Sequence, residues 1–402
     1  MIPTDLSASD LEAVRALRRD IHAHPELAFE ERRTADLIEK TLTSWGIAVH
    51  RGLGRTGVVG ILKNGTSSRN IGLRADMDAL PVQEKNTFAH ASTSPGRMHA
   101  CGHDGHVAML LAAARQLSMT RNFDGTVYLI FQPGEERGGG AREMIKDGLF
   151  ERFPIEALFG AHNWPGLAAG QFAVKSGPVL ASNNEFRITI HGTGAHAAMP
   201  HNGIDPIPVA CEIVQALQTI VSRNRRPLDA GVVSVTMIHA GQTTNVSPDV
   251  CELQGTVRTF TVDLLDLIEQ RMRQITAGIC QAHNTRCELS FSRIYPPTVN
   301  HTSETEFVRE VLGQLFGPQN VLDFEPTMGA EDFSFFLLER PGCYFMVGNG
   351  DGRHRAAGHA NGPCLLHNPS YDFNDELLSL GGSMWTRIAE SWLGRARPAD
   401  DR

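Results

Sequence analysis

The alternation of short apolar runs with helical segments constrains the fold of this chain more than any other feature of its sequence. Two helices are expected first, over about residues 10–22 and 33–45, and the second ends at Gly46. Four apolar runs follow, at Gly57 to Lys63, Asn70 to Arg74, Gly125 to Phe131 and Ala157 to His162, with a helix over Val107 to Leu117 between the second and the third. Runs that are apolar on both faces are typical of buried parallel strands. The sequence therefore predicts an α/β layer with a mixed, mostly parallel central sheet.

A second pattern begins near Gly177 and Pro178. Its predicted elements are a strand at Glu185 to His191, a helix at Ile204 to Val221, strands at Val232 to His239 and Asp249 to Phe260, a helix at Asp263 to His283 and a strand at Cys287 to Phe291. This βαββαβ order is that of a small ferredoxin-like domain. From about Pro296 the first pattern returns. We therefore expect a discontinuous domain of residues 1–181 and 296–402, interrupted by an inserted domain of residues 182–295.

The composition excludes several classes of protein. Of 402 residues, 41% are hydrophobic and 20% are charged, which excludes disorder and favours two domains. The net charge is -8, and neither sign is gathered into a block, so no nucleic-acid or membrane surface is expected. There is no signal-peptide pattern and no apolar run of membrane-spanning length, so a cytoplasmic location is expected. Seven cysteines without paired spacing predict reduced thiols.

Cysteine and histidine gather in one segment, His99-Ala-Cys101-Gly-His103-Asp104-Gly-His106. Cys101 and His103 are two residues apart, so in an extended segment both side chains leave the same face. Thiolate and imidazole are ligands for zinc-like metals, and Asp104 is placed to orient a histidine. The alternative is a glycine-rich helix entry whose histidines are merely polar. We favour a metal site.

Two adjacent carboxylates, Glu135 and Glu136, follow the apolar run that ends at Phe131. Open α/β sheets place their active sites at the carboxyl ends of such strands. Neighbouring side chains of an extended segment diverge, so one Glu can bind metal while the other acts as general base. The alternative is a solvated acidic turn.

Single histidines close two further apolar segments. His162 follows Leu158 to Ala161, and His367 follows Leu365 and Leu366. Each alone is as well explained by a hydrogen-bonded structural histidine. Because all these segments are predicted to end at strand-to-loop junctions, and such junctions share one edge of a parallel sheet, we favour metal ligation.

The inserted domain and the last third of the chain offer further candidates. His196 lies in a loop of small residues, and Asn245 and Arg258 stand near predicted strand ends. Arg258 is suited to pair with a carboxylate, although an ordinary ion pair is an equally good reading. Glu331, in a glycine-led loop, is expected to face the substrate or support the site, and a capping role is its alternative.

Taken together, these segments resemble the M20 metallopeptidase family, and within it the amidohydrolase branch of hippurate hydrolases and plant auxin-conjugate hydrolases. The resemblance covers nearly the whole chain. The residues that carry it are Arg19 to Glu26, Leu73 to Pro81, Met98 to His106, Pro133 to Glu136, Gly194 to Pro206 and Met328 to Phe333.

The resemblance implies a phosphorylase/hydrolase-like catalytic domain with two divalent metal ions, which would be Zn, Mn, Co or Ni. It implies Glu135 as general acid/base and these metal ligands: Cys101, His103, Glu136, His162 and His367. Other branches have a His and a bridging Asp where this chain has Cys and His, so the bridging ligand stays open; Asp76 and Asp78 stand nearby. By likeness, the inserted domain is a lid that forms a homodimer or homotetramer and lends His196 to the partner subunit.

The function that follows is hydrolysis of N-acyl amino acids through a metal-activated water, with Glu135 as base. His196 would stabilise the oxyanion, and Asn245 and Arg258 would hold the free carboxylate of the substrate. Two alternatives are weaker. A Cys101-nucleophile amidase would survive chelation and would leave the other candidate ligands without a role. A non-catalytic, metal-stabilised binding protein would tolerate Glu135→Gln.

Overall fold

The computed structural model describes residues 6–355 and 357–395. Contacts divide the chain into two compact units. The first unit takes the residues up to Gly177, Asn300–Glu325 and the residues from Asp332 onward. The second unit takes Pro178–Val299 and Pro326–Glu331.

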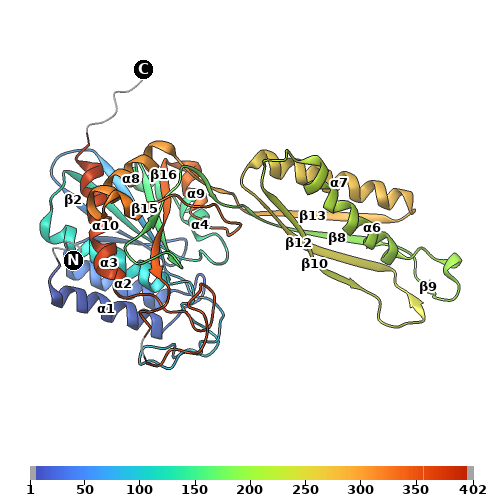
Figure 1. Ribbon diagram of the computed structural model, residues 1–402, viewed down its shortest axis with the longest axis horizontal. Coiled ribbons are helices and arrows are strands. Elements are labelled where there is room, and N and C mark those ends of the chain that lie inside the picture. The colour runs from blue at the N-terminus through green and yellow to red at the C-terminus, as the bar shows by residue number, and fades with distance from the viewer. Residues whose placement is uncertain (1–5, 356, 396–402) are drawn as a thin grey trace, which may run out of the picture. The chain divides into compact units, whose positions relative to one another are not determined.

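The first unit is built on an eight-stranded sheet (Figure 1). Its order is β1 (Ala48–Leu53), β2 (Gly57–Asn64), β4 (Gly125–Gln132), β3 (Asn70–Asp76), β5 (Leu158–Pro165), β16 (Gly342–Gly350), β6 (Phe172–Ala173) and β15 (Val321–Leu322). The central strands β4, β3, β5 and β16 pair in parallel, while β1, β2 and β6 join antiparallel. The predicted mixed, mostly parallel sheet is confirmed. Strand β3 is buried at every position, and its charged residues Arg74 and Asp76 pair with each other in the interior.

Helices bury the sheet of the first unit. They are α1 (Ala8–Ala23), α2 (Arg32–Ser44), α3 (His103–Thr120), α4 (Gly140–Lys146), α5 (Leu149–Arg152), α8 (Thr302–Phe316), α9 (Ser334–Glu339) and α10 (Leu377–Leu393), with a 3-10 turn at Pro318–Asn320. Helices α1, α3 and α10 pack side by side, and their apolar residues join those of the strands in one core. Helix α3 is buried along most of its length, so its first turn is fixed in the interior.

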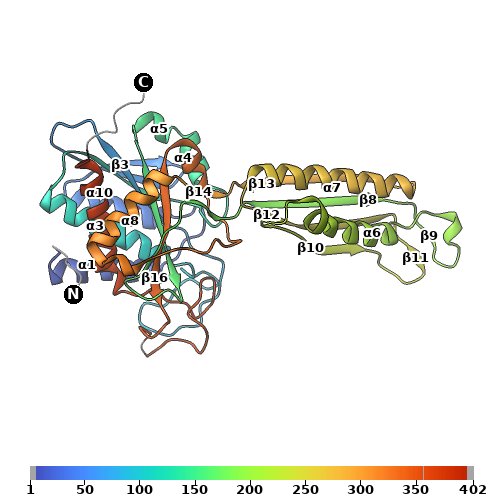
Figure 2. The ribbon, with the colours of Figure 1, turned by 45° about the horizontal axis from the view of Figure 1, so that its top comes forward.

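The second unit has the predicted βαββαβ order, which is confirmed. Its elements are β8 (Asn183–His191), α6 (Pro206–Thr219), β10 (Gly231–Ala240), β12 (Val250–Thr259), α7 (Val262–Ala282) and β13 (Arg286–Tyr295). The sheet order is β10-β12-β8-β13, antiparallel throughout. Helices α6 and α7 pack on the sheet (Figure 2). They share one apolar core with the inward side chains of its strands. Alternation along β8 sets which side chains face that core.

Short elements complete the two units. Strand β7 (Gly177–Leu180) pairs with β14 (Thr298–Asn300), and β9 (Ala195–His196) pairs with β11 (Val246–Ser247). A 3-10 turn covers Pro200–Asn202, and a π-helical turn covers Ile220–Asn224. In the part of the chain that the structure describes, every helix is too short or too polar to span a lipid bilayer. All seven cysteines are free thiols, as expected.

Candidate metal centre

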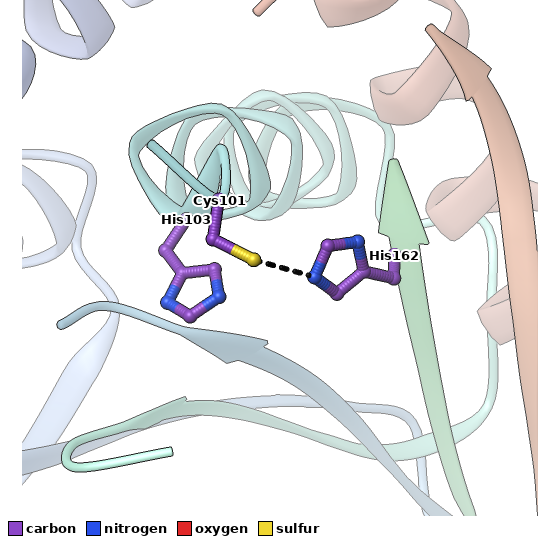
Figure 3. Close-up of side chains that lie close together, drawn as sticks. All are labelled: Cys101, His103 and His162. Atoms are coloured by element: carbon purple, nitrogen blue, oxygen red, sulfur yellow. Dashed lines mark hydrogen bonds between the residues drawn. The ribbon is translucent and has the colours of Figure 1, made fainter. Parts of the chain in front are cut away.

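Three of the predicted ligands meet where α3 begins beside β5. One donor atom from each of Cys101, His103 and His162 lies within 4.8 Å of the others (Figure 3). The Cys101 Sγ and the His162 Nε2 are 3.3 Å apart. All three side chains are buried. A thiol and two imidazoles converging in the interior are of the types and spacing suited to hold a metal ion.

The backbone reason for this convergence differs from the prediction. Cys101 and His103 do not share one face of an extended segment, because Gly102 between them has a left-handed φ of 87°. A Cβ at Gly102 would overlap the side chains of Asn163 and Tyr371. Helix α3 therefore starts at His103 and not at Val107, and the tight glycine turn aims both side chains at one point.

Glu136 and His367 also lie close to Cys101. Donor atoms of Cys101, Glu136 and His367 form a second group within 4.8 Å, and those of His103, Glu135 and Glu136 form a third. The His367 Nε2 is 3.3 Å from the Glu136 Oε1. The groups share Cys101, His103 and Glu136, so the six side chains form one interlocked set.

His367 does not follow a strand, so that prediction was wrong. It lies in a loop with a left-handed φ of 63°, and its side chain is 55% exposed. Its backbone N–H donates to the carbonyl oxygen of Ala100 at 2.7 Å, which docks the loop beside Cys101. This long-range bond replaces the expected strand end.

Glu135 and Glu136 lie in a turn after β4, not in an extended segment as predicted. The N–H of Glu136 donates to the Asp78 Oδ2 at 3.0 Å, and the N–H of Gly134 donates to the Glu31 Oε1 at 2.9 Å. Both carboxylates lie within 4.8 Å of a ring nitrogen of His103. Glu135 is only 7% exposed, and the side chain of Glu136 is also largely buried.

Hydrogen bonds orient two of the histidines so that each offers its Nε2. The His103 Nδ1 donates to the carbonyl oxygen of Asp78 at 2.9 Å, and the His162 Nδ1 donates to the carbonyl oxygen of Asn163 at 2.7 Å. Among the described residues, the His103 Nε2 has no hydrogen-bond partner although it is buried. A buried ring nitrogen that no protein group engages is available to a metal ion, and binding of the ion would displace its proton.

Asp104 does not orient a metal-ligating histidine, contrary to expectation. It points away from that group and pairs with Arg18 at 3.0 Å and with the His22 Nδ1 at 2.9 Å. Asp78 takes the orienting role instead.

The electrostatics of the site fit a cation. Burial, with the charges of Glu136 and Glu135, raises the pKa of the Cys101 thiol well above its usual value. Against the effect of burial, Asp76 and Asp78 raise the pKa of His103 to about 10. Burial and the neighbouring His106 hold the pKa of His162 well below its usual value. Several buried acids and a thiol crowd one small volume, and divalent cations would offset their mutual repulsion.

A neighbouring cluster of Asp76, His103 and His106 has a different explanation. The His106 Nδ1 donates to the Asp76 Oδ1 at 2.6 Å, and the His106 Nε2 accepts from the Asn163 N–H at 3.0 Å. Both ring nitrogens of His106 are therefore engaged. We assign His106 a supporting role beneath the site, in a network with Asn163 and Tyr371 that the sequence did not reveal.

The remaining candidates belong to the second unit. His196 is exposed in β9, and its neighbour Ala197 donates its N–H to the carbonyl oxygen of Asn245 at 3.0 Å, so these two candidates share one end of that unit. Arg258 is half-buried in β12, and burial lowers its pKa. Glu331 is 2% exposed at the end of the segment 326–331, and its carbonyl oxygen accepts from the Thr298 hydroxyl at 3.3 Å.

Known proteins resemble this chain over nearly its full length. The sequence profile of peptidase family M20/M25/M40 matches residues 72–391. A hippurate hydrolase of Campylobacter jejuni is 39% identical over 94% of this chain and 96% of its own length. An IAA-amino acid hydrolase ILR1-like 4 of Arabidopsis thaliana is 38% identical over 94% of this chain and 85% of its own.

A solved structure agrees with these relatives. The YXEP protein of Bacillus subtilis, described as a dinuclear metal-binding peptidase of the M20 family, matches with a TM-score of 0.83 and 31% identity, covering 96% of this chain and 99% of that one. The chain is therefore a metal-dependent amide hydrolase that belongs to peptidase family M20/M25/M40, in its amidohydrolase branch.

Proposed function

We propose that this enzyme hydrolyses the amide bond of N-acyl amino acids to a carboxylic acid and a free amino acid. The observation that carries the proposal is the interlocked set of mostly buried donors around Cys101, His103 and Glu136. The names of the two sequence relatives also support it, because hippurate and IAA-amino acids both join an aromatic acyl group to an amino acid through an amide.

Two divalent ions are proposed to bind in this set, with Cys101, His103, Glu136, His162 and His367 as ligands. Cys101, His103 and Glu136 each belong to two of the three groups, so these three side chains would hold the centre of the site together. A thiolate with imidazoles favours Zn, Co or Ni over Mn. When bound, such ions supply Lewis acidity to the amide carbonyl and acidify a nearby water.

Glu135 is proposed as the general base and acid. Its carboxylate is buried and lies within 4.8 Å of donor atoms of His103 and Glu136, yet five ligands are available without it. It would take the proton of the attacking water and return it to the nitrogen of the departing amino acid, because an amine leaves only when protonated.

Residues of the second unit are proposed to bind the substrate. The guanidinium of Arg258 and the amide of Asn245 suit the free carboxylate of the amino acid, and Glu331 would face the substrate. His196 would donate a hydrogen bond to the developing oxyanion, either in its own subunit or in the partner of a homodimer or homotetramer. A carboxylate-reading pair would select terminal N-acyl amino acids over internal peptide bonds.

A substrate screen tests the function. Purified enzyme is stripped with a chelator, reloaded separately with zinc, manganese, cobalt or nickel, and assayed on N-acetyl, N-benzoyl and N-indoleacetyl amino acids. We expect activity that disappears on chelation and returns with at least one metal. Absence of hydrolysis of every amide with every metal would refute the proposed N-acyl amino acid hydrolase function. Activity that survives chelation would favour a Cys101 nucleophile instead.

A further inference from the structure

The connector between α1 and α2 has no part in the chemistry above, yet it touches the turn that carries Glu135. We propose that Phe29 and Glu31 of this connector clamp the catalytic turn Pro133 to Gly138, and that Glu31 is a positioning residue for Glu135. The clamp rests on the proposed function only for the role of Glu135.

Glu31 uses its carboxylate in an unusual way for its position. It occupies the N-cap of α2 and is fully buried, but it makes no side-chain capping bond to its own helix. Its Oε1 accepts from the Gly134 N–H at 2.9 Å, and its Oε2 accepts from the Thr56 hydroxyl at 2.7 Å. The carboxylate is thus turned from its helix towards the catalytic turn.

Another residue caps α2 in its place. The Glu26 carboxylate accepts from the N–H groups of Arg33 at 3.0 Å and Thr34 at 2.8 Å. Because Glu26 satisfies the start of the helix, the bond from Glu31 to Gly134 serves the turn and not α2. Glu26 is therefore a matched control, since it is a carboxylate of the same connector that accepts backbone bonds but does not touch the turn.

The bond to Gly134 constrains Glu135 from one side, and Asp78 constrains it from the other. The N–H before Glu135 is held by Glu31, and the N–H after it is held by the Asp78 Oδ2 at 3.0 Å. Burial and the charge of Asp78 raise the pKa of Glu31 to about 7. A second acid beside Asp78 in the interior is unfavourable, and the hydrogen bonds from Gly134 and Thr56 offset part of this cost.

Phe29 adds a steric contact to the same turn. It has a left-handed φ of 65°, which is strained for an aromatic residue. Its ring lies against Gly134 and Gly138: a Cβ at Gly134 would stand 2.9 Å from the ring, and one at Gly138 would overlap it. The guanidinium of Arg55, in the turn between β1 and β2, lies 4.4 Å from the centre of the same ring. The strain is therefore held in place by contacts to the catalytic turn.

The test compares Glu31→Ala, Glu31→Gln and Glu26→Ala in the full-length enzyme loaded with cobalt. Glu31→Ala frees the Gly134 N–H, and we expect kcat to fall by about 100-fold, the effect of a displacement of about 1 Å, with KM unchanged. Glu31→Gln keeps an acceptor for Gly134 and should restore kcat to within about threefold of wild type. The visible spectrum of the bound cobalt should be the same in all variants, because no ligand is altered.

The control separates positioning from stability. Glu26→Ala should lower Tm through loss of the cap and leave kcat unchanged. Equal loss of Tm in Glu26→Ala and Glu31→Ala with wild-type kcat in both would overturn the clamp. A Glu31→Gln variant as slow as Glu31→Ala would also overturn it, because charge rather than position would then be responsible. If Glu31→Ala does not fold, Phe29→Leu takes its place, and wild-type kcat in that variant has the same meaning.

Hydrogen exchange separates the clamp from the proposed activity. Glu31→Ala should speed exchange of the Gly134 amide while Glu26→Ala does not, whether or not a substrate is found. An enzyme without activity on N-acyl amino acids but with this exchange difference would refute the proposed function alone. Unchanged exchange at Gly134 would refute the clamp.

Discussion

The two units of this protein specify their structures by different means. In the second unit, alternation along β8 and β12 and two amphipathic helices set the core, and the candidates His196, Asn245 and Arg258 lie on exposed or half-buried surface. In the first unit, the metal centre depends on buried polar groups that hold one another across long stretches of sequence, such as Glu31 with Gly134 and Asn163 with Cys101. Alternating apolar residues are sufficient to form the sheet and helices of the second unit. Precise placement of the side chains in the first unit requires a network of satisfied hydrogen bonds.

The largest expected effect is a loss of kcat on substitution of Glu135 in the first unit. Glu135→Gln keeps the volume and one acceptor oxygen but removes the base, so kcat should fall by about 100- to 10,000-fold. Metal content, measured by elemental analysis, should stay at the wild-type level, because Glu135 is not among the proposed ligands. A variant that loses its metal together with its activity would instead make Glu135 a ligand.

Core truncation in the second unit tests whether the two units are independent. Ile213 on α6 is fully buried in the core of that unit, and Ile213→Ala should destabilise it by about 2–5 kcal/mol. Exposed Gln215→Ala on the same helix should change stability by less than about 0.5 kcal/mol. Urea unfolding gives both values. Metal bound per chain should remain unchanged in each, and its loss in Ile213→Ala would show that the first unit's site depends on the second.

Arg258 of the second unit is proposed to bind the free carboxylate of the substrate. Arg258→Ala should lower kcat/KM on N-acyl amino acids by about 10- to 100-fold, the value of a charge-assisted hydrogen bond of about 1.5–3 kcal/mol. The amide-capped form of the same substrate, which has no carboxylate, should be hydrolysed equally by wild type and variant. An equal loss on both substrates would contradict carboxylate recognition.

The smallest effect concerns a polar cluster beside the metal centre. His22 is buried between Asp104 at 2.9 Å and Glu84 at 3.2 Å. Burial opposes its charge, but Asp104 and Glu84 raise the pKa of His22 to about 9, while His22 lowers the pKa of Glu84 against the effect of burial. Protonated His22 therefore stabilises the folded state. This contribution is fully present below the unfolded pKa of about 6.5 and is lost as the pH rises through 9. Ionised Glu84 also stabilises the folded state. Its contribution is present above the unfolded pKa of about 4.5 and is lost as the pH falls below it.

Stability should therefore decline between pH 6.5 and 9, and His22→Asn should flatten that decline. Unfolding free energies measured across this range check the slope. A variant with the same slope as wild type would show that other groups cause it.

The same contrast explains what could be predicted from the sequence. The mixed sheet, the βαββαβ unit and the family were predicted, because strand alternation and motif spacing are local properties. The segment with Cys101 and His103 was correctly located, but it was expected to be extended. The sequence does not reveal that Gly102 has a left-handed backbone conformation. His367 was expected at a strand end and instead reaches the site through its bond to Ala100.

The supporting residues could not have been found by local reasoning. Glu31 and Gly134 are 103 residues apart, and Tyr371 and Asn163 are 208 apart. No spacing rule relates such pairs. The roles assigned to individual ligands, to Glu135 and to the residues of the second unit remain predictions.

Metal analysis tests the central claim most directly. Wild-type protein, reloaded with cobalt and freed of excess ion, should hold two ions per chain and show a thiolate-to-cobalt absorption band in the near ultraviolet. Cys101→Ala should lose that band and at least one ion, whereas Cys251→Ala, which alters a buried thiol of the second unit, should keep both ions and the band. Wild type that binds no ion, or a Cys101→Ala variant with the content and spectrum of wild type, would contradict the account.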